Sequence, residues 1–231
     1  MPVTARISRV LPFRAPVFRA PAIVASGLAV LLGGCASKGE IDVSGGVGIT
    51  SVRSACPSVG IPASTGDITL FDPPASRDAA AIDVTAVMTN VRSTCNDVGA
   101  DIQTDVTFEI RASRINAGAA RDVTLPYFIA IVRGGTAVTA KRIGRVTVHF
   151  DAGQLRASTT GQATSSIARS AATLPEDVRK KLTEKRKAGD TDAAVDPLSL
   201  PEIRQAVKSA SFEALVGFQL TDEQLKYNAT R

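Results

Sequence analysis

In the segment from Asp101 to Ala112, mostly apolar side chains alternate with polar or charged ones, and this pattern constrains the fold most. One face carries Ile102, Thr104, Val106, Phe108 and Ile110, and the other carries charged or polar residues. A period of two is typical of a half-buried β-strand. Residues 80–91 alternate in the same way, and a turn-forming segment at 95–99 separates the two. We therefore expect these strands to be antiparallel neighbours.

Four further segments predict strands, at 67–71, 123–132, 137–150 and 212–220. Residues 123–132 are apolar on both faces, which indicates an interior strand. Pro126 cannot donate to a ladder and predicts a bulge or a late strand start there. Gly144 predicts a second bulge. Residues 151–172 have weak periodicity, so we expect a loop or a frayed edge strand.

Two Leu-Pro-Glu sequences predict helix starts, because proline fits the first turn and glutamate suits the free amides. The helices are expected at 175–188 and 201–210, and Thr221 to Gln224 matches a capping box. The predicted fold class is mainly β: a two-sheet antiparallel, immunoglobulin-like sandwich over 52–231. Its two short helices form an insert at about 173–210, before the last strand. The alternative is a small α+β fold with both helices on a sheet.

The first 34 residues contain four arginines and no acid, and they end in an apolar run from Ala20 to Leu32. That run is shorter than the roughly 20 residues of a spanning helix, so it predicts an export signal. Leu32-Gly33-Gly34-Cys35 resembles the lipobox of bacterial lipoproteins. The resemblance implies a signal peptide at 1–34, cleavage before Cys35 and a lipid on its thiol. The alternative is an ordinary secretory signal with an incidental cysteine.

A lipidated Cys35 would begin a Gly-rich, polar segment at 35–51, which we expect to be a flexible tether. The lipoprotein resemblance implies a cell-envelope protein, attached to a membrane through its N-terminal lipid. Ala36 stands where aspartate retains well-studied Gram-negative lipoproteins at the inner membrane. Because alanine and not aspartate follows Cys35, we expect the outer membrane, with the domain facing the periplasm.

Cys56 and Cys95 are the two cysteines that remain once Cys35 is assigned to lipid. An exported protein lies where disulfides persist, so we predict that they form a structural disulfide. A zinc site is the alternative, but the chain has only one histidine. A redox pair is a further alternative, but the sequence has no Cys-x-x-Cys motif.

The formal net charge of +5 belongs mostly to the export signal. Without the four arginines of residues 1–34, 23 basic residues stand against 22 acidic ones. A nearly neutral domain has no broad basic field, so we expect no nucleic-acid partner.

Few residues suggest chemistry. His149, the sole histidine, is expected on a strand surface, and the alternative is a general base or metal ligand. Asp190, Asp192 and Asp196 lack the spacing of a calcium loop. The basic run 179–187 is expected to be a solvated helix face, and the alternative is a surface for anionic headgroups. We predict no catalytic residue, no metal site, no cofactor and no enzymatic activity.

Residues 125–128 together with 216–228 resemble an uncharacterised family of small alphaproteobacterial lipoproteins, and that resemblance implies no activity. We expect a non-enzymatic binding or scaffold module at the outer membrane, with an envelope protein as partner. A strand edge is the expected docking surface, through β-augmentation, and the helix at 175–188 is the second choice. The alternatives are a periplasmic small-ligand-binding lipoprotein and, third, an enzyme.

Replacing Cys35 with Ala is expected to move the protein from the membrane fraction to the soluble fraction, or to leave it as uncut precursor. The reason is that the thiol is the lipid acceptor. Cell fractionation with mass measurement of the N-terminus checks this, and Ser37→Ala, which keeps the cysteine, is the control. A Cys35→Ala protein that stays with membranes and is cut at the same bond contradicts the prediction.

Overall fold

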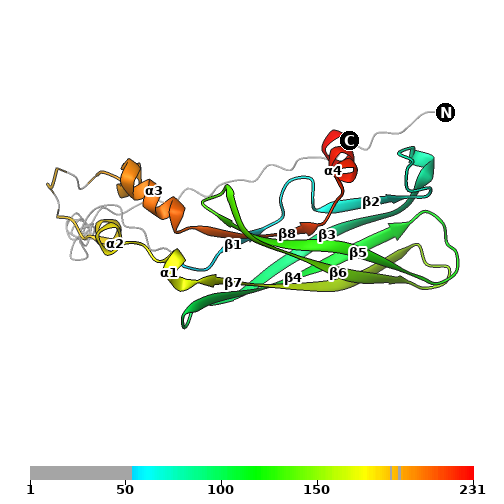
Figure 1. Ribbon diagram of the computed structural model, residues 1–231, viewed down its shortest axis with the longest axis horizontal. Coiled ribbons are helices and arrows are strands. Elements are labelled where there is room, and N and C mark those ends of the chain that lie inside the picture. Colours follow the sequence, from blue (N-terminus) through cyan, green and yellow to red (C-terminus); the bar gives the residue numbers. More distant parts are fainter. Residues whose placement is uncertain (1–53, 188, 192–193) are drawn as a thin grey trace, which may run out of the picture. The chain divides into compact units, whose positions relative to one another are not determined.

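Two four-stranded sheets make up the fold in the computed structural model (Figure 1). The model describes residues 54–187, 189–191 and 194–231, so the predicted signal peptide, Cys35 and tether lie outside the described residues. The first sheet has the order β1 (Ser58–Gly60), β8 (Phe212–Phe218), β5 (Arg121–Arg133), β6 (Ala137–Phe150). The second has the order β2 (Asp67–Phe71), β3 (Ile82–Asn96), β4 (Asp101–Arg114), β7 (Arg156–Ala168).

The alternating segments form the centre of the second sheet, as predicted. Strands β3 and β4 pair antiparallel, with Met88 opposite Ile110 and Cys95 opposite Thr104. The predicted inward face of β4 is buried throughout, Thr104 included. The sequence therefore located both strands and their buried faces, but β3 runs to Asn96 and so includes the first two residues of the turn predicted at 95–99.

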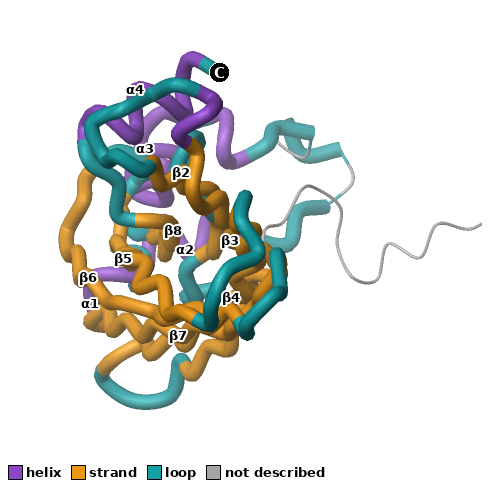
Figure 2. The backbone as a smooth tube through the Cα atoms, turned by 90° about the vertical axis from the view of Figure 1, so that its right-hand side faces the viewer, coloured by secondary structure: helices purple, strands orange, loops and turns teal. Residues whose placement is uncertain are grey.

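The core lies between the sheets, which face one another in the view along the strands (Figure 2). The main cluster draws on both sheets and includes Val84, Val106, Phe108, Ile110, Leu125, Val148, Phe150, Val216 and Phe218. Burying each such side chain contributes about 1.5–3 kcal/mol. The two-sheet sandwich is confirmed, with the helical insert before β8.

Two glycines make room for aromatic rings between the sheets. Gly161 lies opposite Phe108 in the β4–β7 pair, and a Cβ there would lie 2.2 Å from the Phe108 ring. Gly144 lies opposite Tyr127 in the β5–β6 pair, and a Cβ there would lie 2.5 Å from the Tyr127 ring. Each ring lies against the backbone of the neighbouring strand, and the two rings meet edge to face at 5.1 Å.

The bulges expected at Pro126 and Gly144 are wrong. Pro126 lies in register opposite Arg145, and the irregularity of the β5–β6 pair falls between Ile131 and Val132. The Pro126 carbonyl accepts a hydrogen bond from the Gln219 amide at 2.9 Å, so the nitrogen of Pro126 faces the end of β8. The N–H group that proline lacks would lie beyond the end of the β5–β8 pairing, so at most one backbone hydrogen bond is lost and no bulge is needed.

Two other expectations need correction. Residues 156–168 form the edge strand β7, which was one of the two alternatives expected there, but the strand is not frayed, because it pairs with β4 along its length. The first sheet is not wholly antiparallel, because β1 pairs parallel with β8. Strand β5 lies between β8 and β6, which confirms the interior strand predicted from its two apolar faces.

The helices are short. They are η2 (Ala79–Ala81), α1 (Arg169–Ala172), α2 (Glu176–Thr183), η3 (Pro197–Ser199), α3 (Pro201–Ser209) and α4 (Asp222–Thr230). Helix α2 begins after Pro175 and ends at Thr183, well before the predicted residue 188. Val178, Leu182 and Ile203 form a small core between α2 and α3, and the capping box at Thr221 is present.

Cys56 and Cys95 form the predicted disulfide, with an S–S distance of 2.05 Å. The bond joins the segment before β1 to the C-terminal end of strand β3, and so links the two sheets. Among the described residues, no helix has the length and apolarity needed to cross a membrane.

Replacing Gly161 with Ala is expected to lower the free energy of unfolding by about 1–3 kcal/mol, because the new methyl overlaps the buried Phe108 ring. Denaturant titration followed by circular dichroism measures the change. Gly118→Ala is the control, since a Cβ there meets nothing within 4 Å. Equal stability of the two variants would show that the ring does not need the glycine.

Candidate functional site

His149 is exposed on β6, as predicted, but it is not isolated. Its Nδ1 lies 2.6 Å from Asp122 Oδ1 and its Nε2 lies 3.5 Å from Asp151 Oδ1. The hydrogen bond with Asp122 raises the pKa of the imidazole above the ordinary 6.5, partial desolvation opposes this, and the Asp122 and Asp151 charges add to the rise. Asp122 stands directly opposite His149 in the β5–β6 pair, so the cluster is a cross-strand pair on an outer sheet face.

The acidic residues of the 190–196 segment serve the local backbone. Asp196 accepts a hydrogen bond from the Leu198 amide at 2.9 Å and caps η3, and Asp190 accepts from the Lys187 amide at 2.8 Å. Asp192 lies outside the described residues. No cluster of three or more metal-ligating side chains occurs in the part of the chain that the structure describes.

The basic run of 179–187 makes local contacts. Arg179 lies 3.4 Å from Glu176 one turn earlier in α2, and Arg186 donates to the Val195 carbonyl at 2.7 Å. Val178 and Leu182 face the small core of the insert. Residues 179–183 thus form a solvated helix face beside one narrow apolar stripe, whereas residues 184–187 lie beyond the end of α2, so the expected helix face covers only part of the basic run.

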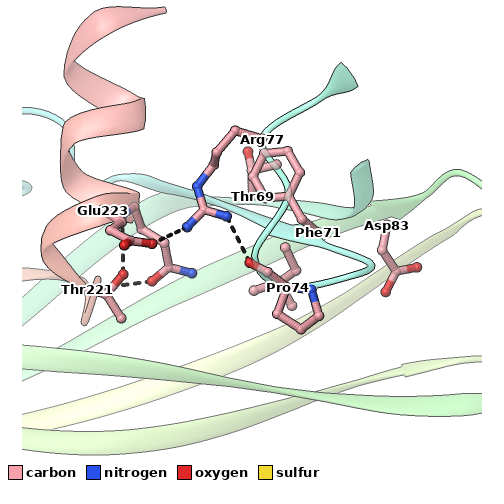
Figure 3. Close-up of a pocket in the computed structure, with 9 residues that line it drawn as sticks. Thr69, Phe71, Pro74, Arg77, Asp83, Thr221 and Glu223 are labelled. Carbon is pink, nitrogen blue, oxygen red and sulfur yellow. Dashed lines mark hydrogen bonds and ion pairs between the residues drawn. The ribbon is translucent and has the colours of Figure 1, made fainter. Parts of the chain in front are cut away.

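A hollow of about 430 Å³ lies between the β2–β3 loop and the start of α4 (Figure 3). Its charged groups are already paired. Arg77 stacks 5.2 Å from the Phe71 ring, bonds Glu223 at 2.6 Å and donates to the Pro74 carbonyl at 2.8 Å. Asp83 pairs with Arg121 at 2.7 Å. These interactions hold α4 against the β2–β3 loop, so the residues of this hollow have a structural role.

Arg114 is a buried charge that sequence patterning missed, since the predicted strand ended at Ala112. It is 5% exposed and donates only to carbonyls, those of Gly118, Ala119, Asp151 and Gln154, at 2.7–3.1 Å. Its guanidinium also stacks on Phe150 at 5.3 Å. The residue ties the β4–β5 loop to the β6–β7 loop, and all of this is structural.

Another concavity lies where β6 and β7 separate. These consecutive strands belong to different sheets, and between them lie two adjoining hollows of about 360 and 40 Å³. We call the pair the β6–β7 groove. It is lined by Tyr127, Ile129, Ile131, residues 140–144 of β6 and residues 162–166 of β7.

Backbone groups of both strands face this groove. The Gln162 carbonyl accepts a hydrogen bond from the Tyr127 hydroxyl at 2.6 Å, so it points away from β4. In an antiparallel sheet the backbone N–H and C=O groups of every second residue point to the same side of the strand. The amides of Thr164 and Ser166 therefore face the groove as well. On β6, the Pro126 carbonyl points to β8, and the opposite residue Arg145 therefore turns its own amide to the free edge.

The opposite side of the sandwich is covered by α4 (Figure 2). Asn228 donates to the carbonyls of Ser64 and Asp67 at 3.0 and 2.8 Å, Arg231 pairs with Asp67, and Tyr227 packs edge-on against Phe71 at 5.3 Å. Natural sheets cover or blunt their edges to avoid unwanted pairing. Within the described residues no such element covers the groove side, which makes β6 and β7 the candidate site.

Neither a scan against protein-family models nor a search of the curated proteins gives a match for this chain. Function is therefore inferred from the geometry of the domain.

Replacing Asp122 with Asn is expected to lower the pKa of His149 toward 6.5, because the hydrogen bond with the carboxylate favours the protonated ring. NMR titration of the imidazole protons measures this, and Asp151→Asn is expected to have a smaller effect. Because the folded pKa is raised, any stabilisation by this pair is complete below pH 6.5 and is lost as pH rises through the folded pKa. An unchanged titration in Asp122→Asn contradicts the assignment.

Proposed function

We propose that this chain is a lipid-anchored protein of the cell envelope whose β-sandwich binds an extended segment of another envelope protein along the β6–β7 groove. The anchor is Cys35, in the outer membrane facing the periplasm, and residues 35–51 are the tether. A flexible chain of that length has a reach of roughly 20 Å, which keeps the domain near the bilayer. The observation that carries the proposal is the pair of edge strands that separate and leave amide groups facing one groove.

The groove has the features that β-augmentation uses. An added strand gains affinity from main-chain hydrogen bonds and specificity from side-chain pockets at alternate positions. Strand β7 offers the amides of Thr164 and Ser166, and its sequence contains neither proline nor an acidic residue. The adjoining hollows offer Ile129, Ile131 and Ala163 as an apolar floor for inward side chains.

A binding role is also favoured over catalysis by what surrounds the titratable groups. Acid–base catalysts usually sit in clefts where burial tunes their pKa. His149 lies on an outer sheet face, with its side chain 59% exposed. The charged groups of the hollow beside α4 are already paired, Arg77 with Glu223 and Asp83 with Arg121.

Replacing Thr164 with Pro is expected to weaken partner binding by about tenfold or more, since it removes an amide that faces the groove and leaves its acceptor unpaired. The fold is expected to survive, because edge strands tolerate a proline whose nitrogen faces outward. Ser165→Pro is the matched control: the neighbouring amide faces β4, so this variant is expected to lose thermal stability.

The measurement is photo-crosslinking in the native envelope, read by mass spectrometry. A crosslinker at Ser166, beside the groove, is expected to capture a defined partner, and one at Thr107, on the outer face of β4, is not. The Thr164→Pro change should abolish the Ser166 adduct. An adduct that persists at full yield in a folded Thr164→Pro protein would refute the groove as the docking site.

A further inference from the structure

Arg142 lines both hollows of the β6–β7 groove. It stands directly opposite Ile129 in the β5–β6 pair, and Ile129 is a core residue that is 5% exposed. Side chains of opposite residues lie on the same sheet face, so Arg142 projects to the inner side, at the open edge. Its neighbour Lys141 also lines the smaller hollow, but its ammonium lies 4.8 Å from the Phe128 ring on the outer face.

The Arg142 guanidinium has no acidic partner among the described residues. None of the residues that line the two hollows is Asp or Glu, so the groove carries a positive charge without a counter-charge. By contrast, Arg77, Arg111 and Arg121 each pair with a carboxylate at 2.6–2.9 Å.

Two hydroxyl groups, one lining the smaller hollow with Arg142 and one opposite it in the β4–β7 pair, lack hydrogen-bond partners among the described residues. Ser165 lines the smaller hollow, and its Oγ is buried without a hydrogen bond to the described residues. Thr104 lies opposite Ser165 on the inner face, is 1% exposed, and its Oγ1 is likewise unpartnered. A buried hydroxyl without a partner costs free energy, and such groups in a native fold call for a ligand or a water. The hollow of about 40 Å³ is large enough for a small polar group.

We infer that the small hollow is a recognition pocket for a carboxylate, supplied by an Asp or Glu side chain of the extended segment that docks in the β6–β7 groove. This inference rests on the proposed function. Arg142 provides the opposite charge and Ser165 donates a hydrogen bond, while backbone amides of β7 hold the segment in register. Charge-assisted hydrogen bonds are short and strong, so one carboxylate at a fixed position would set the specificity of the groove.

A second copy of this chain fits the groove poorly. Pairing through the β6 edge would bring Arg142 of one copy toward the same basic strand of the other, and β6 contains no acidic residue. Like charges directly opposite one another on a sheet are destabilising. The occupant is therefore an acidic segment of a different protein.

The test selects nine-residue peptides from a randomised phage-displayed library on the full chain in detergent. Binders are expected to carry Asp or Glu at one fixed position. For the best peptide, fluorescence anisotropy compares the acid with its amide counterpart on the unmodified chain, on Arg142→Gln and on Arg145→Gln. Arg145 is the matched control, because it lies on the same strand but lines neither hollow.

Exchange of the carboxylate for an amide is expected to weaken binding about tenfold or more, as is Arg142→Gln, and the two changes together should cost little more than either alone. Arg145→Gln should bind like the unmodified chain. Ser165→Ala should bind the acidic peptide more weakly while its unfolding midpoint is not reduced.

The outcomes separate this inference from the proposed function. Peptides that bind, and lose binding with Thr164→Pro, but show no acidic position or keep their acid preference in Arg142→Gln, overturn the carboxylate pocket and leave the groove in place. Selection that gives no binder sensitive to Thr164→Pro overturns both. An acid preference that disappears in Arg145→Gln places the contact on the outer face and also refutes the pocket.

Discussion

The contact between Phe108 and Tyr127 joins the two sheets beside the β6–β7 groove. Each ring lies over a glycine of the neighbouring strand, Gly161 or Gly144, and the rings meet edge to face at 5.1 Å. The Tyr127 hydroxyl then reaches across to the second sheet. Aromatic pairs of this geometry contribute about 0.5–1.5 kcal/mol beyond their buried area. Because β6 and β7 are not paired, this contact and the Tyr127 hydrogen bond join the two walls of the groove.

The strands were predictable from sequence because burial on one face imposes a period of two, which β3, β4 and β8 display openly. Strand β7 was predicted only as one of two alternatives, a loop or a frayed edge strand, because Ser, Thr, Gln and Ala occupy both of its faces and give little periodicity. The bulges predicted at Pro126 and Gly144 were wrong for a shared reason. Pro126 is accommodated because it lies where the pairing with β8 ends, and Gly144 is needed because the Tyr127 ring lies against it. Such tertiary contacts leave no signal in the local sequence.

The candidate site was predictable only in kind. A strand edge was the expected docking surface, but its position depends on which edges remain open, and that follows from where α4 lies. Thr104 gave one signal, as a hydroxyl on the otherwise apolar face of β4. Arg142 gave none, because an arginine in a basic strand is unremarkable until its cross-strand neighbour proves to be the buried Ile129. His149 was placed correctly on a surface, but its pairing with Asp122 needed the β5–β6 register.

The disulfide has a mechanical consequence. Any pull on the chain N-terminal to Ser54 reaches the fold at Cys56, before it reaches the three-residue strand β1. At that point the covalent bond transmits the force to Cys95, near the end of strand β3. Strand β3 is hydrogen-bonded to β4 along most of its length. The parallel β1–β8 pairing is thereby relieved of tension. A domain held by its N-terminus can thus resist a force from a bound partner without first losing the pairing of the short strand β1.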